Sequence, residues 1–454
     1  MATDYDILFK RVDMLDPVEG GRRDVSVAVR DGRIAWVGED GTAPQGAADS
    51  TRVIDGRGRL LIPGFYNIHA HSPMTFMRGY GENLVLQDWL TSRIFPFEDR
   101  LDADAVFWGT QLALAESFRF GIVSSSEMYF HSHDMARAID AAGAKANLAR
   151  CLVAAEGDPP MKSMPSWQEA ERLREEWQGA GDGRIVVDAS LHAEFTATDR
   201  LACALAEDAA EKGLRMQVHA SETRREHDEC KARHGGRTPI AWMAECGLLD
   251  VPTTAAHCVH VETGDIEMMA EKGVTVAANP VSNLKLASGI ADIPAFLQAG
   301  VHVGIGTDGA ASNNRLNLYE DMKYLALLGK AHRQDPTAVT PMEAFFAATR
   351  AGALAQGRED CGRICEGFRA DLVLLDTTGP SWSPIFEMAN AFAYAGSGSD
   401  VCLTMVDGRI VFEGGGRQAE DWKTIDLARV RAETGDAVRC ILSAMEAQMP
   451  EGAG

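Results

Sequence analysis

The sequence predicts an α/β fold, a (β/α)8 TIM-type barrel with a small β-sandwich domain formed by both termini. Between about residues 61 and 369, apolar strand-like runs alternate with helix-like stretches, which is the pattern of such a barrel. Histidines and carboxylates follow the ends of several runs, where barrels of this type carry their functional residues. Two similar hairpin patterns flank this central region, which indicates that the two ends of the chain combine.

The flanking hairpins define the predicted small domain. They are expected at residues 25–38 and 402–414, each with an Asp-Gly pair that tolerates the positive backbone angles of a tight turn. A further strand is expected at 370–376. Chance similarity of two hairpins is the alternative interpretation. The expected division is a β-sandwich domain at 1–60 and 370–420, a metal-dependent barrel at 61–369, and a C-terminal helical segment at 421–454.

The apolar runs of the predicted barrel number eight, at residues 61–68, 121–127, 146–153, 184–191, 215–220, 253–259, 274–279 and 301–307. A doubly wound open sheet is the competing fold. That fold usually carries a Gly-rich phosphate-binding turn after an early strand. No G-x-G-x-x-G sequence opens a helix in this chain, so the pattern favours the barrel.

Composition and charge exclude some classes of binding partner. The formal net charge of -22 argues against nucleic acid or an anionic membrane, because phosphate groups would be repelled. The first residues lack the pattern of a signal peptide, and no run of about 18 apolar residues occurs, so we expect a cytoplasmic protein. The nine cysteines are expected to be reduced, and Cys361 and Cys365 lack a second ligand pair for a structural zinc. A small-molecule partner is expected, and a homo-oligomer is left open.

Metal-binding residue types gather at the ends of the runs. The first run ends in His69-Ala70-His71, and because alternate residues of a strand face the same side, both histidines can bind one metal ion. Taken alone, this pair could have a structural role instead, as two polar side chains that are hydrogen-bonded to the backbone. The later strand ends carry the further candidates His192, His219, Glu222, His257 and Asp308. Their recurrence favours a metal site.

These motifs resemble the amidohydrolase superfamily, and within it the methylthioadenosine/S-adenosylhomocysteine deaminases and their relatives. The resemblance covers nearly the whole chain and implies a metal-bearing barrel with a β-domain built from both termini. It rests on Pro63-Gly64-Phe65-Tyr66-Asn67-Ile68-His69-Ala70-His71, Phe95-Pro96-Phe97-Glu98, His219-Ala220-Ser221-Glu222, Ala256-His257-Cys258, Asn279-Pro280-Val281-Ser282-Asn283 and Thr307-Asp308-Gly309.

The resemblance implies one zinc ion per chain, with iron or manganese as alternatives. Its ligands would be His69, His71, His219 and Asp308, with a water molecule completing the shell. Imidazole nitrogens and a carboxylate suit zinc, and a catalytic zinc site keeps one position for water. Zinc lowers the pKa of such a water to roughly 7.

Three catalytic residues are implied by the same resemblance. Glu222 would act as a general acid/base that carries the proton of the water to a ring nitrogen of a purine. Support of His219 is the alternative role for Glu222. His257 would position the attacking group, and Asp308 would help to pass a proton to the departing ammonia.

The implied substrate contacts are Glu98 to the ribose hydroxyls, Trp89 beside the sugar or thioether, His192 at the base and Arg150 at a homocysteine carboxylate. Pairing of Glu98 with Arg100 and core packing of Trp89 are the structural alternatives. One departure from the relatives stands out. They usually read His-Ala-Pro-Tyr where this chain reads His192-Ala193-Glu194-Phe195, so Glu194 becomes an additional substrate-binding candidate.

The expected function is a zinc-dependent hydrolytic deaminase of S-adenosylhomocysteine, methylthioadenosine or adenosine, releasing ammonia and an inosine-type product. Deaminases or hydrolases of guanine, pterin, aminodeoxyfutalosine and s-triazines share the same metal motifs and remain the alternative. The triplet His192-Ala193-Glu194 matches the H-x-E of cytidine-deaminase-type enzymes, but their P-C-x-x-C partner is absent. A third alternative is a non-catalytic protein that metal only stabilises. Loss of a metal ligand or of Glu222 would indicate such a protein, but this sequence keeps all four ligands and Glu222.

Overall fold

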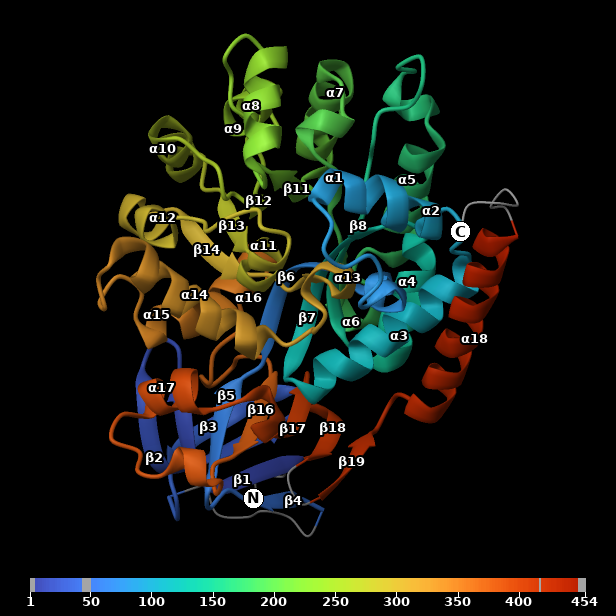
Figure 1. Ribbon diagram of the computed structural model, residues 1–454. Coiled ribbons are helices and arrows are strands. Elements are labelled where there is room, and N and C mark those ends of the chain that lie inside the picture. The colour runs from blue at the N-terminus through green and yellow to red at the C-terminus, as the bar shows by residue number, and fades with distance from the viewer. Residues whose placement is uncertain (1–4, 43–49, 416–417, 448–454) are drawn as a thin grey trace.

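The computed structural model describes residues 5–42, 50–415 and 418–447 and has an α/β fold (Figure 1). Within these residues the named strands form a nine-stranded sheet and two five-stranded sheets. The nine-stranded sheet lies at the bottom of the view in Figure 1, and the other two sheets lie above it among most of the helices. No helix in the described ranges combines the length and the apolar character that crossing a membrane requires.

The nine-stranded sheet joins strands from both ends of the chain, in the order β19-β18-β17-β16-β5-β1-β2-β3 with β4 beside β1. Both predicted hairpins are confirmed, because Arg30 pairs with Arg33 and Val406 pairs with Arg409 across their Asp-Gly turns. The strands are β1 (Ile7–Asp16), β2 (Gly20–Arg30), β3 (Arg33–Glu39), β4 (Arg52–Asp55), β5 (Arg59–Pro63), β16 (Leu372–Asp376), β17 (Val401–Val406), β18 (Arg409–Gly415) and β19 (Gln418–Trp422).

The two five-stranded sheets are parallel throughout and run in the orders β15-β6-β7-β8-β9 and β10-β11-β12-β13-β14. Only Asp188 separates β9 from β10, and only Gly306 and Thr307 separate β14 from β15. The carboxyl ends of neighbouring parallel strands therefore meet on one side. The strands are β6 (Phe65–His71), β7 (Ile122–Tyr129), β8 (Lys145–Arg150), β9 (Ile185–Val187), β10 (Ala189–Leu191), β11 (Met216–Ala220), β12 (Thr253–His257), β13 (Thr275–Ala278), β14 (His302–Ile305) and β15 (Asp308–Gly309).

The first apolar run differs from the prediction because it serves two sheets. Residues up to Pro63 belong to β5 of the nine-stranded sheet, and β6 of the parallel system begins at Phe65. Gly64 lies between them, where a Cβ atom would come within 2.5 Å of Val123 Cγ1. A side chain cannot be accommodated at that distance, so glycine lets the chain pass from one sheet to the other.

Helices follow the parallel strands, and the expected C-terminal helix is present as α18, which packs on α3 (Figure 1). The helices are α1 (Leu86–Trp89), α2 (Phe95–Glu98), α3 (Ala103–Arg119), α4 (Ser132–Ala142), α5 (Pro165–Trp177), α6 (Ala180–Gly183), α7 (Asp199–Lys212), α8 (Arg224–Arg233), α9 (Pro239–Glu245), α10 (Thr263–Glu271), α11 (Pro280–Lys285), α12 (Ile293–Ala299), α13 (Ala310–Asn313), α14 (Leu318–Arg333), α15 (Pro341–Phe346), α16 (Gly352–Ala355), α17 (Met388–Asn390) and α18 (Leu427–Glu446).

A buried ionic cluster joins the nine-stranded sheet to the parallel strands. The ammonium of Lys145, at the start of β8, contacts the carboxylate of Asp371 and lies 2.7 Å from Asp407 Oδ1. The hydroxyl of Tyr66 on β6 donates to the same Asp371 carboxylate. Lys145, Tyr66 and Asp371 are buried, so each charge depends on its partner within the protein.

Candidate active site

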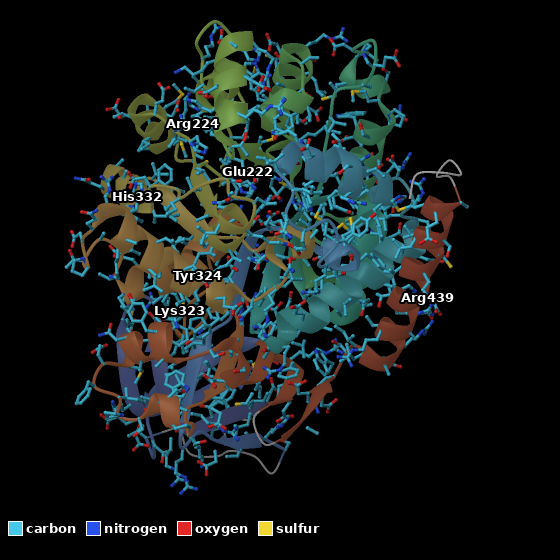
Figure 2. The ribbon with its side chains drawn as sticks, in the orientation of Figure 1. Glu222, Arg224, Lys323, Tyr324, His332 and Arg439 are labelled. Atoms are coloured by element: carbon cyan, nitrogen blue, oxygen red, sulfur yellow. The ribbon has the colours of Figure 1, made fainter. Side chains whose placement is uncertain are left out.

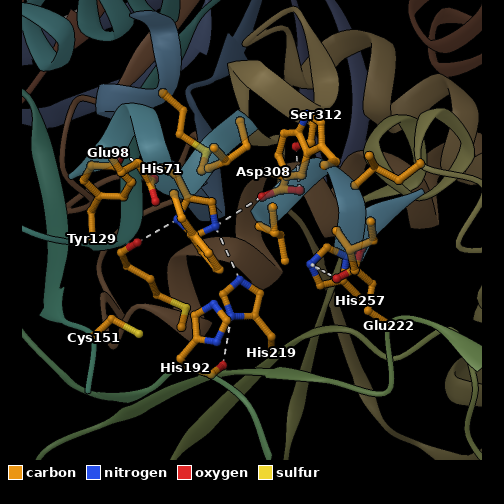
Figure 3. Close-up of a pocket in the computed structure, with 18 of the residues that line it drawn as sticks. His71, Glu98, Tyr129, Cys151, His192, His219, Glu222, His257, Asp308 and Ser312 are labelled. Atoms are coloured by element: carbon orange, nitrogen blue, oxygen red, sulfur yellow. Dashed lines mark hydrogen bonds and ion pairs between the residues drawn. The ribbon is translucent and has the colours of Figure 1, made fainter. Parts of the chain in front are cut away.

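The four predicted metal ligands converge at the carboxyl ends of β6 and β11 and at the start of β15. Figure 3 shows His71, His219 and Asp308 of this set. The Nε2 atoms of His71 and His219 lie 3.3 Å apart. Asp308 Oδ1 lies 3.2 Å from Nε2 of His71 and 3.5 Å from Nε2 of His69. The ligand atoms of His69, His71 and His219 all lie within 4.8 Å of one another. The donors therefore face a common point.

The protonation of these side chains fits a divalent metal ion. His71 Nδ1 donates to the carbonyl of Met128 at 2.6 Å, and His219 Nδ1 donates to the carbonyl of His192 at 2.9 Å. Each of these bonds leaves the Nε2 lone pair free for a metal. The Nε2 atom of His69 is buried and has no hydrogen-bond partner among the described residues. Burial lowers the pKa of His69 to about 4, which keeps this imidazole neutral at pH 7.

Asp308 is oriented by two serines that the sequence reasoning did not single out. Its Oδ2 atom accepts hydrogen bonds from Ser282 Oγ at 2.6 Å and Ser312 Oγ at 2.7 Å. Burial opposes ionisation of Asp308, but its contacts with His69 and His71 hold its pKa well below the usual range. The backbone φ of Asp308 is +61°, a left-handed conformation that Asp tolerates better than most non-glycine residues. Both serines follow late strand ends, which was the available sequence signal.

Glu222 and His257 lie beside this cluster. Glu222 Oε2 is 3.9 Å from His257 Nε2, and Glu222 Oε1 accepts a hydrogen bond from Ser288 Oγ at 3.1 Å. His257 Nδ1 donates to Asn283 Oδ1 at 2.8 Å, which orients the ring. Burial raises the pKa of Glu222, which brings its proton exchange closer to neutral pH. Figure 2 shows Glu222 near the strand ends, whereas Arg439 lies at the outer surface.

The turn that carries Glu222 is held by Glu226, another residue that the sequence reasoning missed. The carboxylate of Glu226 accepts the backbone N–H of Ser221 at 2.9 Å and that of Glu222 at 2.7 Å. Thr223 and Glu226 also form a capping box at the start of α8. Burial, followed by the nearby charge of Glu222, raises the pKa of Glu226 to about 7. The Thr-x-x-Glu spacing was the sequence signal for this arrangement.

A pocket opens over the cluster and encloses about 830 Å³ with its mouth included. His71, His219, Asp308, Glu222 and His257 line its metal end. The apolar part of the wall comprises Met74, Leu86, Leu90, Ile94, Phe95, Met128, Phe130, Val153, Phe195 and Leu286.

Three predicted substrate residues, Trp89, Glu98 and His192, line this pocket. Glu98 Oε1 accepts a hydrogen bond from the hydroxyl of Tyr129 at 2.6 Å. Burial raises the pKa of Glu98 to about 7, although this hydrogen bond works in the opposite direction. Tyr129 ends β7 and was not singled out from the sequence, although its strand-end position gave a signal.

Glu194 is not among the residues that line this pocket, so the structure does not support it as a substrate ligand. Arg233 at the end of α8 donates to both of its carboxylate oxygens, at 3.0 and 2.5 Å. His234 Nε2 lies 2.8 Å from Glu194 Oε1. A buried carboxylate needs such partners, and Arg233 and His234 hold Glu194 outside the pocket lining.

Arg150 is also not brought to the pocket above the metal cluster. Its Nε donates to Glu169 Oε2 at 2.6 Å, and its Nη1 donates to the carbonyl of Cys151 at 2.5 Å. It lines a neighbouring cavity instead, where its guanidinium carbon lies 5.1 Å from the centre of the Phe130 ring.

Comparisons with known proteins agree with this geometry. Residues 60–411 match the model of the amidohydrolase family. A 5-methylthioadenosine/S-adenosylhomocysteine deaminase of Moorella thermoacetica is 40% identical over 408 residues, covering 90% of this chain and 93% of the relative. A 5'-deoxyadenosine deaminase of Methanothermobacter thermautotrophicus is 39% identical over 427 residues, covering 94% and 98%.

A solved structure of an adenosine deaminase from Xanthomonas campestris with bound zinc is 28% identical and superposes with a TM-score of 0.90. The superposition covers 98% of this chain and 100% of that one. An atrazine chlorohydrolase from Arthrobacter aurescens, at 23% identity and a TM-score of 0.86, shares the fold. Together with the histidine and carboxylate cluster, these similarities show that the chain belongs to the amidohydrolase family.

Proposed function

We propose that the protein is a zinc-dependent hydrolytic deaminase of adenine nucleosides that releases ammonia and an inosine-type product. One observation carries the proposal: a single pocket holds the metal-ligand cluster, the Glu222–His257 pair and the half-buried carboxylate of Glu98. The metal-ligand cluster and the Glu222–His257 pair can carry out hydrolysis, and Glu98 can recognise a sugar. The names of the relatives, which act on adenine nucleosides, support the same choice of substrate.

The fold proposed for this site is a (β/α)8 barrel at residues 61–369. The parallel pairings support it, because they lead from β6 through β14 and return from β15 to β6, with short breaks at Asp188 and at Gly306-Thr307. The strands of residues 1–60 and 370–420 would form the small β domain, to which β5 adds residues up to Pro63 and β19 residues up to Trp422. Residues 421–454 would form the C-terminal helical segment.

In this proposal His69, His71, His219 and Asp308 hold the zinc ion. When bound, zinc supplies the Lewis acidity that allows a water molecule to ionise near neutral pH. Glu222 takes a proton from the attacking water and delivers it to a ring nitrogen of the purine.

His257, fixed by Asn283, positions the water. Asp308 accepts a proton and passes it to the departing ammonia. On the substrate side, ionised Glu98 accepts hydrogen bonds from the ribose hydroxyls, Trp89 lies against the sugar side, and His192 contacts the base.

An ammonia-release assay on the zinc-loaded protein tests this proposal. Adenosine, 5′-methylthioadenosine and 5′-deoxyadenosine should react, whereas adenine, guanine, pterin and an s-triazine should react at least about a hundredfold more slowly, because they lack the ribose hydroxyls that Glu98 would bind. Chelation should abolish the activity, and added zinc should restore it. A free base or pterin that reacts as fast as the nucleosides would overturn the proposal.

The Glu222→Gln variant tests the proton carrier within the same assay. It should keep its zinc and lose on the order of a hundredfold or more in kcat, the usual scale of general acid/base catalysis. Glu267→Gln, an equivalent change at an exposed position of α10, serves as the control and should behave like the original protein. Near-normal turnover by zinc-loaded Glu222→Gln would contradict the assignment.

A further inference from the structure

A second group of metal-binding residue types lies at the end of α8, outside the lining of the active-site pocket. It comprises Glu194, Cys230 and His234, whose candidate ligand atoms all lie within 4.8 Å of one another. Glu194 and Cys230 are buried, and the side chain of His234 is only 18% exposed. A carboxylate, a thiol and an imidazole therefore face one another where water has little access.

The chain brings these three side chains together from two segments. Cys230 and His234 are four positions apart at the end of α8, so they lie on the same face of the helix. Glu194 begins the short helical turn Glu194–Thr196 that follows β10. The Sγ atom of Cys230 lies 3.5 Å from the carbonyl oxygen of Arg237. The cluster thus joins the segment after β10 to the end of α8.

The surroundings of His234 suit a metal ligand. Its Nδ1 atom lies 3.8 Å from Asp199 Oδ1, and the indole N–H of Trp242 donates to the same Asp199 oxygen at 2.8 Å. A carboxylate beside one ring nitrogen favours the tautomer with its proton there, which leaves the other nitrogen free to bind a metal ion. That other nitrogen, Nε2, points at Glu194 Oε1 from 2.8 Å.

Arg233 competes with a metal ion for Glu194, because its guanidinium donates to both carboxylate oxygens. The side chain of Arg233 is 40% exposed, however, and its Nη1 atom also lies 3.5 Å from Glu229 Oε2. An ion pair with a partly exposed partner is weak compared with the binding of a metal ion by a thiolate. Arg233 can therefore turn toward Glu229 and leave Glu194 to the metal ion.

We propose that Glu194, Cys230 and His234 form a second metal site, which binds a thiophilic divalent ion such as Zn²⁺, while the active site keeps its single ion. Cysteine sulfur, histidine nitrogen and carboxylate oxygen are all zinc ligands. On binding, the thiol of Cys230 releases its proton to solvent, and water completes the shell. The ion ties the segment after β10 to α8. The inference does not depend on the deaminase function, because its test measures metal binding rather than turnover.

Titration of the metal-free full-length protein with Co²⁺ tests the proposal. The ligands proposed for the active site are nitrogen and oxygen atoms, so a sulfur-to-cobalt charge-transfer absorption shows that a cysteine also binds metal. We expect this absorption at saturation, together with about two cobalt ions per chain. A protein that saturates with one cobalt ion and lacks the absorption would overturn the proposal.

Two cysteine variants identify the thiol. Cys230→Ser should abolish the charge-transfer absorption and bind one cobalt ion, and retention of that ion shows that the variant is folded. Cys151→Ser is the matched control, because Cys151 is also a buried thiol and lines the active-site pocket. This control should keep the absorption. An absorption that persists in Cys230→Ser, or that disappears in Cys151→Ser, would overturn the assignment.

The competition by Arg233 provides an independent measurement. Arg233→Met should tighten Co²⁺ binding at the thiolate site by about tenfold, because the ion no longer displaces a guanidinium from Glu194. Lys231→Met removes an equal charge from the same helix, where Lys231 pairs with Glu262, and should leave the midpoint of the absorption titration nearly unchanged. Binding that is unchanged or weaker in Arg233→Met would show that Glu194 is not a ligand.

Discussion

At the scale of single residues, Glu98 links recognition to pH. Burial raises its pKa to about 7, and the hydroxyl of Tyr129 donates to the carboxylate. The ionised form accepts hydrogen bonds through both oxygens, whereas the protonated form uses one oxygen as a donor and accepts less well. Below pH 7 the protonated form therefore predominates, and the carboxylate loses acceptor capacity.

The pH profile of kcat/KM for adenosine should accordingly rise with pH through about 7. Tyr129→Phe removes a donor that stabilises the ionised form, so this rise should move to higher pH. In Glu98→Gln the rise of kcat/KM through about pH 7 should be absent. Profiles measured between about pH 5.5 and 9 for the three proteins check the assignment, and a rise that stays in place in both variants would assign it to a different group.

The limits of sequence reasoning at this scale come from distant partners. The proximity of His69, His71, His219 and Asp308 was predictable because each stands near a strand end, and parallel strands bring such ends together, whereas their choice as ligands came from the family resemblance. Glu194 and Arg150 also follow strand ends, but helical residues take up their charges. Arg233 lies 39 positions after Glu194, and Glu169 lies 19 positions after Arg150. The local sequence pattern gives no indication of the Glu194–Arg233 and Arg150–Glu169 pairs.

At the scale of elements, the start of α8 determines where Glu222 lies. Glu226 accepts the buried backbone N–H groups of Ser221 and Glu222, and Ser221 has a φ of +50°. The same capping-box geometry recurs at α15, where Thr340 and Glu343 are exposed and far from the pocket lining. The chain thus contains a buried capping box and an exposed one, which allows a matched comparison.

Glu226→Ala should lower the free energy of unfolding by about 2–3 kcal/mol, since it leaves two buried donors unpaired as well as removing a cap. It should also lower kcat, because the turn that carries Glu222 loses its support. Glu343→Ala should cost only about 0.5–1 kcal/mol and leave kcat unchanged. Urea unfolding and turnover of both zinc-loaded variants provide the measurement. Equal effects of the two substitutions would show that Glu226 is an ordinary cap.

The strands themselves followed the sequence closely, with two main departures: the first run divides at Gly64 into β5 and β6, and the fourth run divides at Asp188 into β9 and β10. Apolar periodicity indicates where a strand lies but not which neighbour it pairs with. Pairing depends on contacts between distant parts of the chain. For example, β5 pairs with β16, and the paired residues Leu61 and Leu374 are more than 300 positions apart. The paired hairpins indicated that the ends combine, whereas the strand order required the structure.

At the scale of the whole molecule, the Lys145 cluster connects the sheets. Lys145 belongs to β8, Asp371 precedes β16, and Asp407 lies in the turn before β18. The ammonium and the Asp371 carboxylate are both buried, so neither charge is solvated when its partner is removed.

Lys145→Met should therefore lower the free energy of unfolding by about 3–5 kcal/mol, the cost of an unpaired buried charge. Adding Asp371→Asn should recover part of that loss, because the double variant has no uncompensated carboxylate at that position. Arg137→Met, which breaks the surface pair with Asp134, should cost less than about 1 kcal/mol. Denaturant unfolding of the three variants checks the ranking, and a Lys145→Met protein as stable as Arg137→Met would refute it.

The passage from β5 to β6 through Gly64 also constrains how this chain can be recombined with its relatives. The strand that carries His69 and His71 continues directly from a central strand of the nine-stranded sheet. A chimera joined within residues 59–71 would graft the metal ligands onto a foreign support, and the backbone has no loop there to absorb a change in angle. Crossovers outside this continuous segment leave the ligands in place. The segments that follow the other strands can therefore be exchanged with relatives, whereas β5 and β6 must come from the same parent sequence.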